Sequence, residues 1–367
     1  MTKKPSPPLG IENVDRAQFR STLLDGFRDG VDAASPGPLL RMASMLLSVT
    51  SHPDGSPEHT PEFIRRLLAW NCVESSAGAL AMATLAGHAD LRRRVRRDLA
   101  DRGHFVPRWL ADLHRSTSVA RAVEVSGPFR DLDDLVLGVT TPTGHPLTAV
   151  VRVDNEIRSR DVGGALFEHP LDTVVDGMTR PGDPDVHVRD ISPADVRARL
   201  EAALSGPDVD ALIGKSTDWS SQRPILRWML ALLTAGGDAT VPGSMDDVDL
   251  DAVAAEFLAS PWGRPWTRRG LPLLLEEILA DGLGNGIGDP LLWAPHHVRR
   301  LLGVEPAEAL LDHLDAGRTP ELLRDLIRYG HAERGLRPEL IDRSLAAVDR
   351  HADSFLDAVR AWQSDAG

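Results

Sequence analysis

The sequence predicts a predominantly α-helical α+β fold, with a small antiparallel β-sheet inserted between N-terminal and C-terminal helical regions. Three observations support this prediction. Apolar residues recur at helical spacing before about residue 115, alternate between residues 119 and 153, and return to helical spacing from about residue 249. The chain has 367 residues, of which 42% are apolar and 26% charged, so it is long enough for two or three folded domains.

The first helical region is expected at residues 14–115, after an N-terminus, residues 1–13, that is rich in proline and lysine and is expected to be disordered. Thr60 followed by Pro61 marks a helix start, because a proline at the first helical position loses no hydrogen bond. Residues 89–102 form another expected helix, which Gly103 ends.

The sheet is expected within an α+β region at residues 116–234. Ser192 is the expected N-cap of a helix that begins at Pro193, with Asp195 in its first turn. The expected strands are residues 119–125, 135–140, 147–153 and 186–191.

A linker is expected at residues 235–248, because this segment is rich in glycine and proline and has no apolar period. The second helical region is then expected at residues 249–367, where several segments carry an apolar stripe.

The formal net charge of −13 opposes non-specific binding to nucleic acid or to an anionic membrane, so neither partner is expected for the chain as a whole. The charge is uneven: residues 1–120 carry 16 basic and 13 acidic side chains, whereas residues 241–367 carry 13 and 22. The single cysteine excludes an intramolecular disulfide, and the longest apolar stretches are too short to cross a bilayer. We therefore expect a cytoplasmic protein, and the motifs predict neither a metal site nor a cofactor.

One arginine cluster is a candidate for binding a polyanion. Arg92 and Arg96, and likewise Arg93 and Arg97, are four residues apart on one expected helix and therefore lie one turn apart on adjoining faces. Three aspartates on the same helix weaken the positive field, so an ordinary solvated helix face is the alternative interpretation.

A second candidate surface lies in the C-terminal region. Trp262 and Trp266 occur in a segment with Arg268 and Arg269, and aromatic residues combined with arginine are typical of interfaces when exposed. The alternative is that both rings are buried between helices.

Several short motifs along the chain stand out: Pro107-Arg108-Trp109-Leu110, Leu135-Val136-Leu137-Gly138-Val139, Leu147-Thr148-Ala149-Val150-Val151, Ser192-Pro193-Ala194-Asp195, Phe257-Leu258-Ala259-Ser260-Pro261 and Asp289-Pro290-Leu291-Leu292-Trp293. With these motifs the chain resembles a group of actinobacterial proteins of similar length that has no established function. The similarity spans about residue 14 to the end and implies no catalytic residue. In that group the strand ending in Val-Asp is followed by His-Asn-Leu-Gly, whereas here Asp154 is followed by Asn155-Glu156-Ile157-Arg158.

A polar site between the sheet and the C-terminal helices is a third candidate. Asp154 and Asn155 stand at the end of an expected strand, where side chains often line a cleft, and Asp161 and Trp293 are the other expected ligand-binding residues. The alternative for Asp154 is a strand-end aspartate that caps a turn.

These features lead first to a non-catalytic interaction or regulatory protein that binds a protein partner or itself, because no catalytic, metal or nucleotide motif is intact. An enzyme or small-ligand-binding protein that uses the polar site is the alternative. Nucleic-acid binding through the arginine cluster is the second alternative, and whether the protein is an enzyme stays open.

Overall fold

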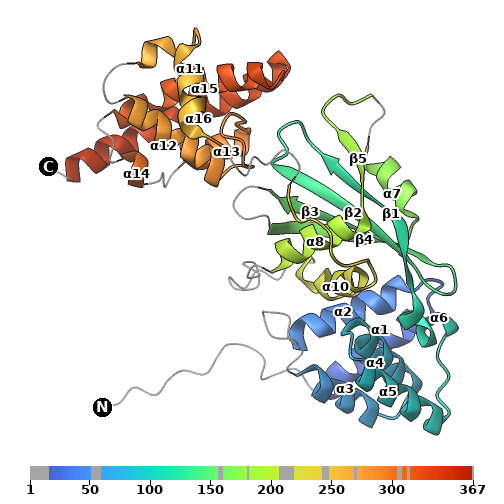
Figure 1. The fold of residues 1–367 in the computed structure, drawn as a ribbon. Coiled ribbons are helices and arrows are strands. Elements are labelled where there is room, and N and C mark those ends of the chain that lie inside the picture. Colours follow the sequence, from blue (N-terminus) through green and yellow to red (C-terminus); the bar gives the residue numbers. More distant parts are fainter. Residues whose placement is uncertain are drawn as a thin grey trace, which may run out of the picture.

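The computed structural model describes residues 16–50, 59–155, 160–179, 182–205, 219–241, 248–267, 271–303, 308–311 and 315–365. It confirms a predominantly helical α+β fold with one antiparallel sheet. Figure 1 shows a layer of helices, then the sheet, then a second group of helices beyond the far end of the sheet.

The N-terminal helices pack around α4, in which every residue from Ser75 to Leu85 is buried. The residues of α4 are mostly small, so neighbouring helices approach its backbone closely, and a Cβ atom on Gly78 would lie 2.4 Å from the ring of Phe27. The elements of this layer are α1 (Arg16–Asp32), α2 (Gly37–Thr50), α3 (Thr60–Ala69), α4 (Val73–Leu85), α5 (Ala89–Arg102), α6 (Arg108–Ala111) and the short 3₁₀ helix η1 (Leu113–Arg115).

The sheet has five antiparallel strands in the order β4-β3-β2-β1-β5. The pattern of alternating residues predicted four of them; the additional one is β4, at the edge of the sheet. The turn between β2 and β3 is closed by a hydrogen bond from the Thr141 amide to the His145 carbonyl of 3.0 Å. The strands are β1 (Thr117–Ser126), β2 (Leu132–Thr140), β3 (Pro146–Asp154), β4 (Arg160–Phe167) and β5 (His187–Ile191).

Helices cover both faces of the sheet. On one face, α7 (Leu171–Met178) packs on a small apolar cluster that includes Val136 and Val150. On the other face lie α8 (Pro193–Leu204) and, after the 3₁₀ helix η2 (Ser220–Gln222), α10 (Arg223–Ala231). The predicted N-cap of α8 is confirmed, because the Ser192 hydroxyl accepts a 3.0 Å hydrogen bond from the Asp195 amide.

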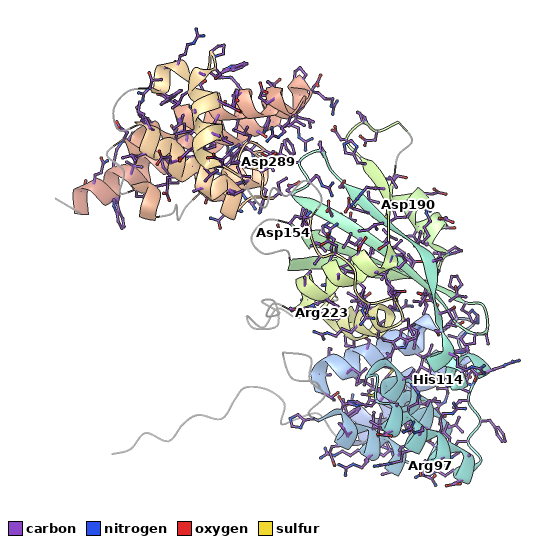
Figure 2. All side chains as sticks on the ribbon, in the orientation of Figure 1. Arg97, His114, Asp154, Asp190, Arg223 and Asp289 are labelled. Carbon is purple, nitrogen blue, oxygen red and sulfur yellow. The ribbon has the colours of Figure 1, made fainter. Side chains whose placement is uncertain are left out.

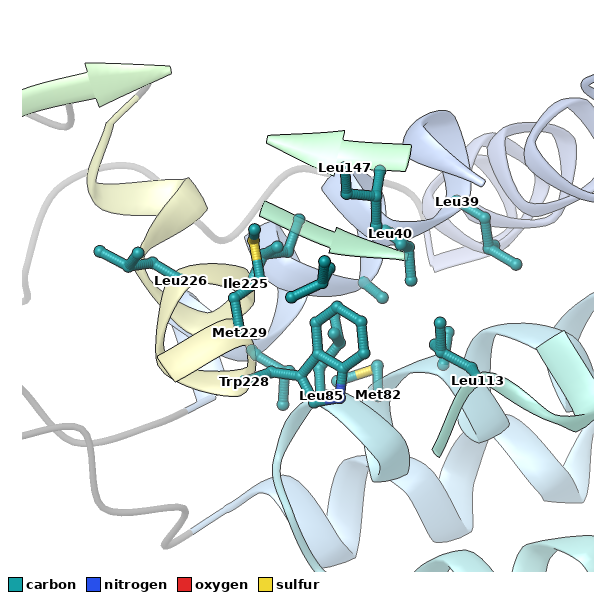
Figure 3. Packing of buried hydrophobic residues seen from close by; sticks show 14 of the residues in the cluster. Leu39, Leu40, Met82, Leu85, Leu113, Leu147, Ile225, Leu226, Trp228 and Met229 are labelled. Atoms are coloured by element: carbon teal, nitrogen blue, oxygen red, sulfur yellow. The ribbon is translucent and has the colours of Figure 1, made fainter. Parts of the chain in front are cut away.

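One hydrophobic core joins the N-terminal helices to the sheet. It contains residues of α1 to α5, of β2 and β3, and of α8 and α10. Figure 3 shows Trp228 and Met229 of α10 beside Met82 and Leu85 of α4. The ranges 14–115 and 116–234, expected as separate regions, therefore share this core.

The C-terminal helices have a second core, built around Trp293, Phe257 and Phe355. A small cluster of Phe129, Ala294 and Leu340 joins them to the turn between β1 and β2, and the Phe129 ring lies 5.7 Å from that of His331. The elements are α11 (Leu250–Ala259), the 3₁₀ helix η3 (Arg264–Trp266), α12 (Leu271–Gly284), α13 (Pro295–Leu301), α14 (Glu308–Leu311), the 3₁₀ helix η4 (Ala316–Arg318), α15 (Thr319–Glu333) and α16 (Pro338–Asp365).

Candidate functional site

The arginine cluster lies on α5, and the apolar stripe of that helix determines where the arginines point. Val95 and Leu99 are buried against the N-terminal core, which turns the opposite side of the helix to solvent. Arg93, Arg96 and Arg97 are exposed there and line one shallow hollow of the surface, and Arg92 is half-buried beside them. The predicted face is thus formed by four guanidinium groups on two turns of one helix.

Few carboxylates compensate these charges. Arg93 pairs with Asp90, three residues before it, and Arg102 pairs with Asp98 at 2.9 Å. In the part of the chain that the structure describes, Arg92, Arg94, Arg96 and Arg97 form no ion pair. Like charges one helical turn apart destabilise a helix by about 0.2–0.5 kcal/mol per pair, so a bound anion would relieve repulsion here.

The electrostatics of Arg92 reflect this uncompensated charge. Burial lowers the pKa of Arg92 from its ordinary value, and the positive charges of Arg96 and Arg93 lower it further. For an arginine that is paired with a carboxylate, such as Arg152 beside Asp134, the pKa is raised instead, first by the hydrogen bond that the guanidinium donates to that carboxylate. Arg92 therefore lies in a positive potential that comes from its own helix.

His114 of η1 lies beside the arginines of α5. His114 is half-buried; burial lowers its pKa, and the charges of Arg92 and Arg96 lower it further, as does that of Arg115, while Asp112 opposes them. The chain must therefore turn back after α5 and bring η1 alongside the arginines. These effects favour the neutral form of His114, and an anion bound to the arginines would raise its pKa.

An exposed ring, Phe105, follows α5 closely, in the loop between α5 and α6. Its side chain is 89% exposed, the largest value among the exposed large hydrophobic residues of the described chain. Neither Phe105 nor His114 was a predicted site residue. Their exposure and position depend on how the loop packs, and the local sequence does not carry that information.

The α5 face lies at one end of the molecule, far from the acidic C-terminal helices. Figure 2 shows Arg97 at one end of the molecule and Asp289, between α12 and α13, in the C-terminal group on the other side of the sheet. β1 begins at Thr117, directly after η1, and its far end leads into the turn that contacts those helices. A ten-residue strand such as β1 spans about 33 Å. The sheet therefore separates α5 from the C-terminal helices by about this distance.

The predicted polar site is brought together only in part. Asp154 and Asn155 are both buried, and the Asn155 amide donates a 2.9 Å hydrogen bond to the Arg130 carbonyl. Asp154 lies close enough to Asp131 and to His296 of α13 to affect the pKa of each. For Asp131, burial raises the pKa and the Asp154 charge adds to this, whereas the His296 charge lowers it.

Asp161 and Trp293 do not complete that site. The backbone of Asp161 lies in β4 opposite Val153, and its side chain is outside the described residues. Trp293 is fully buried in the C-terminal core, where its ring stacks on His297 at 4.2 Å and its Nε1 donates to the Pro290 carbonyl at 3.0 Å.

A buried ion-pair cluster lies next to Asn155 and holds α8 on the sheet. Arg199 of α8 pairs with Glu124 of β1 and, at 2.6 Å, with Asp133 of β2, and all three side chains are at most 3% exposed. Burial raises the pKa of Glu124, but the hydrogen bond from Arg189 and the charges of Arg130 and Arg199 outweigh it, so the pKa is lowered. Such a cluster orients the elements that carry it.

The two tryptophans of the second candidate surface differ in burial. Trp266 is 2% exposed, its Nε1 donates to Asp325 at 3.0 Å, and the Arg318 guanidinium lies 4.4 Å from its ring centre. Trp262 is half-buried, with its ring 6.2 Å from that of Tyr329. Arg268 and Arg269 lie outside the described residues.

Within the described ranges, no three His, Cys, Asp or Glu side chains lie close enough to hold a metal ion, and no helix is both long and apolar enough to cross a bilayer. Comparison of the chain with protein families, curated proteins and solved structures finds no match. The α5 face is therefore interpreted from its own geometry.

Proposed function

We propose that the protein binds nucleic acid and that the exposed arginines of α5 hold the phosphate backbone. The observation that carries the proposal is that Arg93, Arg96 and Arg97 line one surface hollow, while Arg92, Arg96 and Arg97 have no carboxylate partner among the described residues. Guanidinium groups bind phosphate oxygens through paired hydrogen bonds, and several on one face follow a polyanion better than a single charge.

The net charge of −13 does not oppose this proposal at α5 itself. Exposed charges in physiological salt interact over a Debye length of about 8 Å, and the sheet separates α5 from the acidic C-terminal helices by about four such lengths. Residues 89–116 alone carry eight arginines and four aspartates. A ligand at this face therefore experiences a local positive potential.

Salt dependence tests the proposal directly. If four arginines contact phosphates of a single strand, log K falls with a slope of about −3 against log[salt], which is about a 50-fold loss of affinity between about 50 and 200 mM salt. The measurement is fluorescence anisotropy of a labelled oligonucleotide titrated with the full-length protein. Absence of binding at the lowest salt would refute the proposal.

A matched pair of double variants locates the contact. Arg96→Gln/Arg97→Gln removes two positive charges from the face and is expected to weaken binding and to reduce the magnitude of the slope by about 1.4. The control Arg65→Gln/Arg66→Gln removes two charges from α3, where both arginines are exposed and pair with Glu62. Equal effects of the two double variants would count against α5 as the site.

An acidic protein surface is the competing partner for the same arginines. Polyglutamate offers carboxylates at comparable charge density but no phosphates and no bases. If polyglutamate displaces the oligonucleotide at equal charge concentration, the face recognises acidic polypeptides and the nucleic-acid proposal fails.

A further inference from the structure

Phe105 is presented to solvent by a loop whose backbone is held on both sides. The His104 amide donates to the Leu99 carbonyl at 2.9 Å, closing the end of α5, and the His104 ring nitrogen Nδ1 lies 2.9 Å from the Ser76 hydroxyl of α4. On the other side, Val106 packs against the core. The backbone that carries the exposed ring is thus held, and the backbone part of the ordering cost on binding is avoided.

The exposure of this ring runs against the hydrophobic effect. Burial of a phenylalanine side chain is favourable, yet the ring of Phe105 packs on almost nothing in the described chain. An exposed aromatic ring offers a flat face on which a planar ligand can stack.

Positive charge lies on both sides of this ring along the chain. Arg108, at the start of α6, has a side chain that is 87% exposed and pairs with Asp112 only at 3.8 Å. On the other side, Arg96 precedes the end of α5 at Gly103 by seven residues, or about 10 Å along the helix axis. A strand of a few nucleotides is long enough to reach from the hollow of α5 to the ring of Phe105.

We infer that the α5 face recognises single-stranded nucleic acid, with a base stacked on Phe105 and the adjacent phosphates held by Arg96, Arg97 and Arg108. This inference rests on the proposed function. A ring beside an arginine row is the combination that single-strand binders use, since every base has a face to stack, whereas the paired bases of a duplex are stacked on each other and leave the ring no partner.

The test compares a labelled single strand of about 15 nucleotides with the matched duplex, using full-length protein at about 50 mM salt. Phe105→Ala is expected to weaken single-strand binding by roughly tenfold or more and to leave duplex binding unchanged. Phe105→Trp keeps a stacking ring and is expected to retain single-strand affinity. Phe19→Ala, at another exposed phenylalanine, is the matched control and is expected to have no effect.

The outcomes distinguish base stacking on Phe105 from phosphate binding by the arginines of α5. If strand and duplex bind equally and Phe105→Ala changes neither, while Arg96→Gln/Arg97→Gln weakens both, the single-strand inference is wrong and the phosphate contacts stand. If neither nucleic acid binds, both fail. If Phe105→Ala and Phe105→Trp weaken binding equally, the effect comes from the loop conformation and the stacking role is overturned.

Discussion

The Nη2 atom of Arg199 lies 2.6 Å from the Oδ2 atom of Asp133, and both side chains are buried at the boundary between α8 and the sheet. The same guanidinium also bonds Glu124 and the amide oxygen of Asn155, the latter at 3.2 Å. One side chain therefore ties α8 to β1, to β2 and to the residue that follows β3.

Removing this arginine should be costly because Arg199 is the fully buried cation between two buried carboxylates. The other cation that bonds both, Arg130, is 23% exposed and lies 2.7 Å from Glu124 but 3.4 Å from Asp133. We expect Arg199→Ala to lower the free energy of unfolding by about 3–5 kcal/mol, measured by urea denaturation at pH 7. Arg189→Ala removes another partner of Glu124 whose side chain is 49% exposed, and it should cost no more than about 1 kcal/mol. Similar losses in the two variants would contradict the structural role of Arg199.

Two glycine-to-alanine substitutions should change the stability of the protein in opposite directions. A Cβ on Gly78 would lie 2.4 Å from the ring of the fully buried Phe27, so Gly78→Ala should destabilise the protein by about 1–3 kcal/mol. At Gly177 in α7 a Cβ meets nothing within 4 Å, and Gly177→Ala should stabilise by up to about 1 kcal/mol, because alanine is the better helix former. Thermal unfolding of both variants checks this, and a shift of the midpoint in the same direction for both would refute it.

His331 should make stability fall as the pH is lowered. Its side chain is fully buried and Nε2 accepts the Trp293 amide at 3.1 Å; burial lowers the pKa of His331 to about 4. The unfolded chain therefore takes up this proton first, and the stabilising contribution, complete above pH 6.5, is lost as the pH falls toward 4. The stabilisation by His331 that is lost between pH 7 and pH 5 is about 2 kcal/mol.

The measurement for His331 is urea denaturation at pH 7 and pH 5 for the natural protein and for His331→Gln, whose side-chain oxygen can accept the same amide. The difference in stability between the two pH values should be smaller in the variant by about that amount. His351→Gln, at a half-buried histidine of α16, is the control. A pH dependence that His331→Gln leaves unchanged would show that other groups account for it.

Local signals predicted the elements that local chemistry determines, and missed those that depend on packing. The Ser192 cap is readable because a hydroxyl three residues before an amide forms the cap wherever the helix lies. β4 was missed because Gly163 and Gly164 interrupt any alternating pattern. The glycine at 164 has a tertiary reason: a Cβ there would lie 2.4 Å from the Trp219 ring and 2.6 Å from the Val150 carbonyl.

The same division applies to the candidate sites. The spacing of Arg93 and Arg97 predicts a charged helix face from the sequence alone, because helix geometry converts a spacing of four into one turn. That Phe105 is exposed and that His114 returns to Arg92 are consequences of the loop after α5 and of its contacts with α4. No pattern within the loop encodes them.

His114 offers a direct reporter of anion binding at α5. Its pKa is lowered by burial and by Arg92 and Arg96, with Arg115 acting in the same direction and Asp112 against it. A phosphate placed on the arginines reverses much of their contribution, so the pKa of His114 should rise when an oligonucleotide binds at low salt. By linkage, the affinity should increase as the pH is lowered from 7 through this pKa, and His114→Gln should remove that part of the increase.

Histidine resonances followed by NMR titration, with and without the oligonucleotide, measure the effect, and His351 on α16 serves as the internal control. If the oligonucleotide binds while the pKa of His114 stays constant, then the phosphates do not lie on Arg92 and Arg96, and the contact must be sought elsewhere on the surface.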